Sequence, residues 1–182
     1  MKILFVIAAL RNGGAERVLN VLANELSRDN EITIALLEED LGLYKFSEKI
    51  NIINLNVTGS GLALKFKKIL ALRALFKEQK ADLIMSFIDW TNVACVLANA
   101  GLKSKLIATE HHEHSYLKSK IASAMRDFSY KFVDGLSVLS KSDYDYYKFA
   151  KNRKIIHNPL FIDVSEICEK QNVILSVARL EA

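Results

Sequence analysis

The sequence predicts an α/β fold built on a doubly wound parallel sheet. Apolar runs of strand length alternate with segments whose apolar residues recur at helical spacing. The first run, residues 3–9, is continuously apolar, as expected for a strand covered on both faces. Only one proline and seven glycines occur among the 182 residues, so regular structure should dominate.

The expected elements follow one another as strand, helix, strand. A first helix is expected at 15–28, where Val18, Leu19, Leu22 and Leu26 share one face. Further strands are expected at 32–37, 50–55, 83–87, 106–109 and 136–139. Further helices are expected at 62–80, 91–100, 117–132 and, from a Ser140 cap aided by Ser142 and Asp143, through 149. One face of the helix at 117–132 carries Leu117, Ile121, Met125, Phe128 and Phe132.

Composition and charge limit the classes of protein that fit. Hydrophobic residues make up 51% and charged residues 25%, as in a globular domain. Cys95 and Cys168 lack metal-ligand spacing and suit buried thiols in a reducing cytosol. No apolar run reaches the roughly 18 residues of a membrane span, and the first run is interpreted as a strand rather than a signal peptide. The net charge of +4 suits nucleic acid, an anionic membrane or a diphosphate substrate.

In sheets of this class, ligands bind at the carboxyl ends of the strands, where loops lead into helices. The first such loop carries Gly13 and Gly14, and paired glycines permit positive φ angles and close approach of a ligand. Free amides at the start of the following helix favour an anion or a sugar hydroxyl. The loop lacks a Gly-x-Gly-x-x-Gly fingerprint and a Walker lysine. A tight turn that binds nothing is an open alternative.

Three histidines, His111, His112 and His114, lie within four residues after the strand at 106–109. Histidine and glutamate bind zinc, but neighbours in an extended segment point in opposite directions, and no fourth ligand pattern follows. No metal site is therefore expected. We expect instead that His111 or Glu110 hydrogen-bonds a ligand hydroxyl, with a solvated loop as the alternative.

The loop at 86–92 carries the polar residues Asp89 and Thr91 where a helix N-cap belongs. Capping is the expected role of both. Trp90 is expected to be half buried, with stacking on a sugar or contact with lipid as alternatives.

Two expected helices carry an excess of basic residues. At 62–80, the basic set falls within about half of the circumference and interleaves with large apolar side chains: Lys65, Lys68, Arg73, Lys77 and Lys80. The helix at 117–132 adds Lys118, Lys120, Arg126 and Lys131. This mixture indicates an interfacial helix on an anionic membrane, or alternatively a core helix whose lysines extend to water. Nucleic acid is disfavoured because no recognition motif accompanies the charge.

The pattern changes after residue 156. His157, Asn158 and Pro159 interrupt it, a linker follows, and residues 173–177 form a new apolar run. We therefore expect one domain at 1–160, and at 161–182 a linker followed by the first strand of a second domain. A strand that opens a new unit so close to Ala182 indicates a chain that is cut short.

Taken in order, these segments resemble the family 4 retaining glycosyltransferases, which have the two-domain GT-B fold. Six short motifs carry the resemblance over nearly the whole chain: 13–17 (GGAER), 86–92 (SFIDWTN), 109–111 (TEH), 136–140 (LSVLS), 157–159 (HNP) and 176–180 (SVARL). The likeness is greatest to bacterial enzymes that add N-acetylhexosamines to polyprenyl-diphosphate oligosaccharides. It implies that the expected sheet is the Rossmann-like N-terminal half of a GT-B enzyme.

The resemblance also implies the reaction, a retaining transfer from a nucleotide sugar, usually a UDP-sugar, without a metal or other cofactor. The N-terminal domain would hold a lipid-linked glycan acceptor, in the cytoplasm and peripherally on the inner face of the plasma membrane. The implied site residues are His111 and Glu110 at the reacting centre; Gly13, Gly14, Glu16 and Asn158 around the substrates; and Arg179 at the departing diphosphate. The basic character of the helix at 62–80 leads us to expect Lys65, Lys68, Arg73 and Lys77 at the membrane or the acceptor diphosphate.

Two departures from the family pattern affect these expectations. Ala178 stands where a glycine is expected, and the lysine and the distal Glu-x7-Glu motif of the nucleotide pocket would fall beyond Ala182. The 182-residue chain alone is therefore expected not to catalyse transfer. The rival functions are a non-catalytic Rossmann-like module that binds a phosphorylated or lipid ligand, and a dinucleotide-dependent oxidoreductase. The glycine fingerprint fails for the latter.

Overall fold

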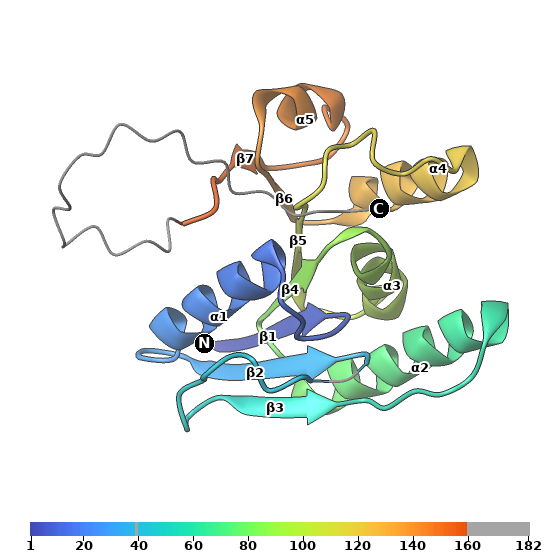
Figure 1. The fold of residues 1–182 in the computed structure, drawn as a ribbon. Coiled ribbons are helices and arrows are strands. Elements are labelled where there is room, and N and C mark those ends of the chain that lie inside the picture. Colours follow the sequence, from blue (N-terminus) through green and yellow to red (C-terminus); the bar gives the residue numbers. More distant parts are fainter. Residues whose placement is uncertain (39, 160–182) are drawn as a thin grey trace, which may run out of the picture.

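Seven parallel strands form a single sheet in the computed structural model, which describes residues 1–38 and 40–159 (Figure 1). Its order is β3-β2-β1-β4-β5-β6-β7. The strands span Lys2–Ile7 (β1), Glu31–Leu36 (β2), Asn51–Asn54 (β3), Leu83–Phe87 (β4), Lys105–Thr109 (β5), Gly135–Val138 (β6) and Arg153–Ile155 (β7). The direction of winding reverses between β1 and β4, which neighbour each other in the sheet. Ligands of doubly wound folds bind at this switch point.

Helices cover both faces of the sheet unequally. One face packs against α1 (Gly14–Leu26), and the other against α2 (Gly61–Gln79), α3 (Asp89–Asn99), α4 (Lys120–Ser129) and the segment around α5 (Lys141–Tyr146). Strand alternation divides the core accordingly. Ile3, Phe5 and Ile7 of β1 belong to the α1 side, whereas Leu4 and Val6 belong to the side of α2 and α3. The doubly wound α/β fold expected from the sequence is thus confirmed.

The structure also corrects several local expectations. The helix expected at 117–132 begins only at Lys120, and a short 3-10 turn, Tyr130–Phe132, follows it. The last helix ends at Tyr146 rather than at residue 149. The sequence analysis did not expect β7, because this short edge strand is basic rather than apolar. Ser140 does cap α5, where its hydroxyl accepts a hydrogen bond from the amide of Asp143.

The capping role expected of Asp89 and Thr91 is wrong. Ile88 occupies the N-cap position of α3, and no side chain caps the helix there. Ile88 and Asp89 have φ angles of 69° and 28°, in a region that residues with a side chain rarely adopt. This strained turn lies at the end of β4, beside the switch point, and it frees the Asp89 carboxylate for another partner.

Among the residues that the structure describes, no helix is long and apolar enough to cross a membrane. Cys95 is a buried free thiol, as expected, and burial raises the pKa of this thiol well above its ordinary value. Cys168 and the expected second-domain strand lie outside the described residues.

Candidate functional site

The loops that follow β1, β4, β5 and β6 lie side by side along the carboxyl edge of the sheet, because these four strands are neighbours. The first of them contains Gly13 and Gly14. Neither glycine has a positive φ, so the conformational reason expected from the sequence is wrong. A Cβ at Gly13 would meet only the carboxylate of Glu16, the flexible end of a side chain that can move aside, so space does not require glycine at this position either. A Cβ on Gly14 would meet no atom within 4 Å, which leaves the backbone at the start of α1 open to a ligand.

His111 follows β5 and packs with its ring stacked on Phe87, at a centroid distance of 5.6 Å and an interplanar angle of 14°. Burial, with a smaller contribution from neighbouring His112, lowers the pKa of His111 to about 4. The nearby side chain of Asn158 partly offsets the shift. His111 is therefore neutral at physiological pH. Its Nδ1 is buried and has no hydrogen-bond partner within the described part of the chain.

Glu110 points to the opposite face of the sheet and is only 2% exposed. The amide of Asn92 donates to Glu110 Oε1 at 3.1 Å, to the Thr109 carbonyl at 3.1 Å and to the Tyr130 hydroxyl at 2.9 Å. Burial, reinforced by the negative charge of Asp89, raises the pKa of Glu110 to about 8. The enclosed carboxyl is thus largely protonated at neutral pH, a position that fits support of the loop rather than contact with a substrate.

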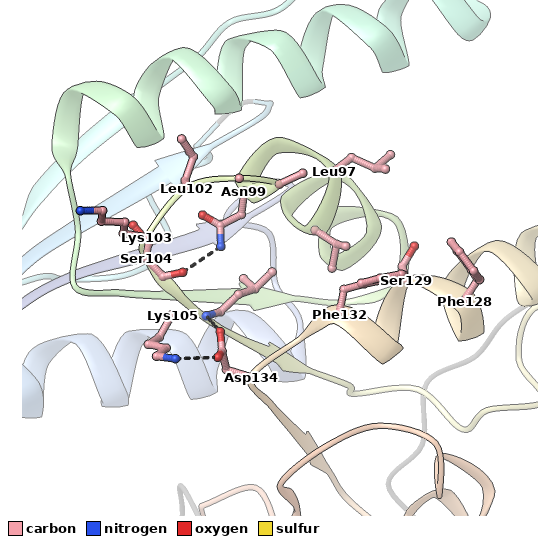
Figure 2. Close-up of a pocket in the computed structure, with 14 residues that line it drawn as sticks. Leu97, Asn99, Leu102, Lys103, Ser104, Lys105, Phe128, Ser129, Phe132 and Asp134 are labelled. Atoms are coloured by element: carbon pink, nitrogen blue, oxygen red, sulfur yellow. Dashed lines mark hydrogen bonds and ion pairs between the residues drawn. The ribbon is translucent and has the colours of Figure 1, made fainter.

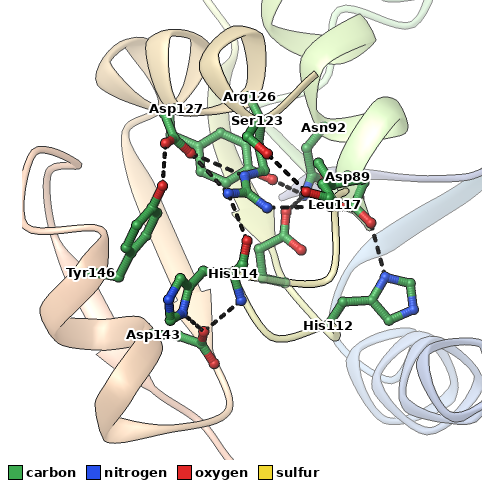
Figure 3. Close-up of polar contacts among 12 residues, drawn as sticks. Asp89, Asn92, His112, His114, Leu117, Ser123, Arg126, Asp127, Asp143 and Tyr146 are labelled. Carbon is green, nitrogen blue, oxygen red and sulfur yellow. Dashed lines mark hydrogen bonds and ion pairs between the residues drawn. The ribbon is translucent and has the colours of Figure 1, made fainter. Parts of the chain in front are cut away.

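The other two histidines of the loop bind separate aspartates (Figure 3). His112 Nδ1 lies 2.9 Å from Asp89 Oδ2, and its ring stacks on Tyr116. His114 Nδ1 lies 2.9 Å from Asp143 Oδ1, which also accepts a hydrogen bond from the His114 amide. The loop is therefore fixed to the start of α3 and to the start of α5. Between residues 1 and 159, Glu39 aside, no three potential metal ligands come together.

Arg126 joins this network from α4 and is 1% exposed. Its guanidinium donates to the His114 carbonyl at 3.1 Å, pairs with Asp127 at 3.1 Å and approaches Asp89 at 3.9 Å (Figure 3). The interfacial alternative for the helix at 117–132, which placed Arg126 among residues facing a membrane, is wrong for this arginine because its side chain is buried. Its role, like those of Asn92 and Tyr130, depends on partners that are distant in sequence.

The four basic residues expected at the membrane or the acceptor diphosphate have different surroundings. Lys68 is buried and pairs with Glu38 at 2.9 Å, and Arg73 donates to the carbonyls of Ala98 and Ala100. These two side chains hold α2 to its neighbours. Lys65 and Lys77 are exposed, and the Lys65 ammonium lies 4.7 Å from the centre of the Trp90 ring. Arg179 lies outside the described residues.

A hollow of about 520 Å³ lies at the opposite edge of the sheet, between the end of α3 and the 3-10 turn (Figure 2). Two intramolecular contacts lie in its wall: the Asn99 side-chain amide donates to the Ser104 carbonyl, and Lys105 pairs with Asp134. It lies at the amino ends of β5 and β6, away from His111. Because ligands of such sheets bind at the carboxyl ends, the edge with His111 is the candidate site.

Comparison with known sequences identifies the family of the chain. Residues 12–166 match the profile of Glycosyltransferase Family 4. The chain is 41% identical over 191 residues to an α-1,4-N-acetyl-D-galactosaminyltransferase of Campylobacter jejuni, whose name gives GalNAc-α-(1→4)-GalNAc-α-(1→3)-diNAcBac-PP-undecaprenol as its substrate. The match covers 100% of this chain and 53% of that relative. The chain therefore spans about half the length of the relative.

Solved structures share the fold at low sequence identity. UDP-GlcNAc 2-epimerase from Neisseria meningitidis matches with a TM-score of 0.69 at 15% identity, over 87% of this chain and 47% of that one. The lipopolysaccharide outer core galactosyltransferase WaaB matches with a TM-score of 0.64 at 15% identity, over 90% of this chain and 47% of that one. Anabaena Alr3699/HepE in complex with UDP matches with a TM-score of 0.62 at 17% identity, over 88% of this chain and 44% of that one. These likenesses concern the fold alone.

Proposed function

Because the chain belongs to Glycosyltransferase Family 4, we propose that it forms the acceptor-binding part of a retaining glycosyltransferase. The proposed donor is a nucleotide sugar, a UDP-hexose or UDP-N-acetylhexosamine, and the proposed acceptor is a polyprenyl-diphosphate-linked glycan. The observation that carries the proposal is a neutral, partly buried His111 at the carboxyl edge of the sheet, the same edge at which α1 begins. The acceptor class is taken from the Campylobacter relative at 41% identity.

The proposed roles follow from the chemistry of each group. Transfer of a sugar develops negative charge on the departing diphosphate, which backbone amides at a helix start stabilise. Gly14 supplies such an amide, whereas the Gly13 amide donates to the Arg11 carbonyl at 3.0 Å, and Glu16, folded over Gly13, accepts hydrogen bonds from sugar hydroxyls. Neutral His111, supported by Asn158, binds a hydroxyl at the reacting centre without adding a charge. The proposed role of Arg179 is to neutralise the departing diphosphate.

We further propose that the domain binds peripherally to the anionic cytoplasmic face of the membrane. Exposed apolar side chains recur along α2 and along α4 with its 3-10 turn: Leu62, Phe66, Leu70, Ile121, Met125, Phe128 and Phe132. Exposed lysines flank them at positions 65, 67, 118, 120 and 131. A surface with apolar side chains bordered by lysines is typical of interfacial binding to anionic lipid.

A chimeric enzyme tests the transferase proposal. These 182 residues would replace the matching 53% of the Campylobacter relative, and transfer of a labelled sugar to polyprenyl-diphosphate glycans would be measured. We expect transfer, and an approximately hundredfold lower rate for His111→Ala. The matched control, Glu113→Gln, changes an exposed side chain of the same loop and should leave the rate unchanged. A folded chimera that binds UDP but transfers sugar to no lipid-linked acceptor would contradict the proposal.

A further inference from the structure

An apolar groove of about 640 Å³ runs between α2, α3 and α4. Its walls include Phe66 and Ile69 of α2, Trp90 and Val93 of α3, and Ala122 and Met125 of α4. Phe66 is 62% exposed and Met125 43%, although both are large apolar side chains. A groove of this volume could hold about twenty water molecules, yet its walls offer water few polar partners.

The groove lies close to the candidate site. Each helix of this face follows a strand, so the first turns of α2, α3 and α4 all lie near the carboxyl edge of the sheet. The groove is lined by those first turns, and Asp89 forms part of its wall. Asp89 Oδ2 lies 2.9 Å from Nδ1 of His112, which is adjacent in sequence to His111. A molecule that leaves the groove across this edge therefore reaches the His111 loop.

The charge around the groove favours a hydrocarbon chain with an anionic head. Exposed Lys65 lies in its wall, with its ammonium over the Trp90 ring. Lys118 and Lys120 are exposed on either side of Ser119, which lines the groove and caps α4. The first turns of the three helices add the positive ends of their dipoles. Apolar walls and a cationic edge together match a lipid phosphate.

We propose that this groove binds the first isoprene units of the acceptor's polyprenyl chain. The inference rests on the proposed function and specifies where the lipid part of the acceptor lies. The diphosphate is held at the groove's cationic edge, and the glycan crosses the carboxyl edge of the sheet toward His111. The polyprenyl chain thus occupies a defined site on the protein, distinct from the general contact of the exposed apolar side chains with a bilayer.

Trp90 provides a direct readout, because it is the single tryptophan of the chain and lines the groove. Its fluorescence would be titrated with farnesyl phosphate, geranyl phosphate and inorganic phosphate on the 182-residue chain. We expect saturable binding of farnesyl phosphate. Loss of one isoprene unit should weaken binding at least about tenfold, because fewer carbon atoms are buried. Inorganic phosphate should leave the fluorescence unchanged.

Three variants separate the groove from the rest of the apolar surface. Ala122→Phe fills the groove without removing apolar surface, and should weaken farnesyl phosphate binding at least about tenfold while vesicles of phosphatidylglycerol and phosphatidylcholine still bind. Phe66→Ser removes an exposed wall residue and should also weaken farnesyl phosphate binding. Leu70→Ser is the matched control, since Leu70 is exposed on α2 but does not line the groove. It should leave farnesyl phosphate binding unchanged.

Two results would overturn the groove proposal. One is equal affinity of the parent chain, Ala122→Phe and Phe66→Ser for farnesyl phosphate. The other is a Trp90 response to vesicles but none to farnesyl phosphate. Either result, obtained together with sugar transfer by the chimera, would reject the polyprenyl groove and leave the transferase function intact. Groove binding without transfer would instead count against the proposed function.

Discussion

Replacement of Glu110 by glutamine tests whether burial raises the pKa of this carboxyl and thereby makes the stability of the protein depend on pH. The pKa of Glu110 is raised from 4.5 to about 8 in the folded chain, whereas the unfolded chain should titrate near 4.5. Between these values the folded state binds a proton that the unfolded state has released. The free energy of unfolding therefore falls as pH rises through this window. At ~1.4 kcal/mol per pH unit, the loss from this group alone amounts to about 5 kcal/mol.

Glu110→Gln should remove this dependence and keep the hydrogen bond from Asn92, since the glutamine carbonyl can accept it. Urea unfolding, followed by circular dichroism at pH 5, 6, 7 and 8, measures the effect. We expect similar stability of both proteins at pH 5, and a glutamine variant that is more stable by several kcal/mol at pH 8. Glu113→Gln, an exposed neighbour, is the matched control and should follow the parent chain throughout. Parallel loss of stability by the parent and Glu110→Gln would show that burial does not keep this carboxyl protonated.

The other predictions concern His111 and two of the lysines of α2, Lys65 and Lys68. In an NMR pH titration, the His111 ring should stay neutral until the pH approaches 4, and its burial should cost stability as pH falls from 6.5 toward that value; a midpoint near 6.5 would contradict its enclosure. Lys65→Met should leave the free energy of unfolding within about 0.5 kcal/mol, yet weaken binding to anionic vesicles at low salt. Lys68→Met should have the reverse effect, with stability changed by about 1 kcal/mol and vesicle binding preserved, because this lysine is buried against Glu38. Equal vesicle binding by the parent chain, Lys65→Met and Lys68→Met would contradict a role of Lys65 in membrane binding.

Much of the fold could be predicted because its signals are local. The apolar run of β1 is buried on both faces, and the hydroxyl of Ser140 caps the helix that begins beside it. Strand β7 escaped prediction because an edge strand pairs on one side only and can be basic, as Arg153 and Lys154 are. The pairing of Asp89 with His112 could not be predicted for another reason. Its partner His112 is 23 residues away, so local capping rules could not identify it.

The candidate site was predicted in location better than in detail. The end of β5 could be identified because ligands of parallel sheets bind at carboxyl ends. The properties of its residues could not, because they depend on distant partners. Asn92 and Tyr130 enclose Glu110, and Asn158 reaches His111 from the end of the described chain. Burial likewise could not be read from the charge of Arg126.

Strand alternation places adjacent residues of the loop on opposite faces of the sheet, both of which are buried. Desolvation disfavours the charged form, so it raises the pKa of an acid and lowers the pKa of a base. The ladder continues beyond β5, since the amide of Glu110 donates to the Ser137 carbonyl at 2.9 Å. Glu110 therefore points with Leu106 and Ala108 toward α3 and the 3-10 turn, where burial raises its pKa. His111 points to the other face, against Phe87 in the core beside α1, and its pKa falls. Both side chains lose their charge for the same reason, desolvation. The loop consequently presents a neutral imidazole, supported by a neutral acid, at the edge where a charged diphosphate is proposed to bind.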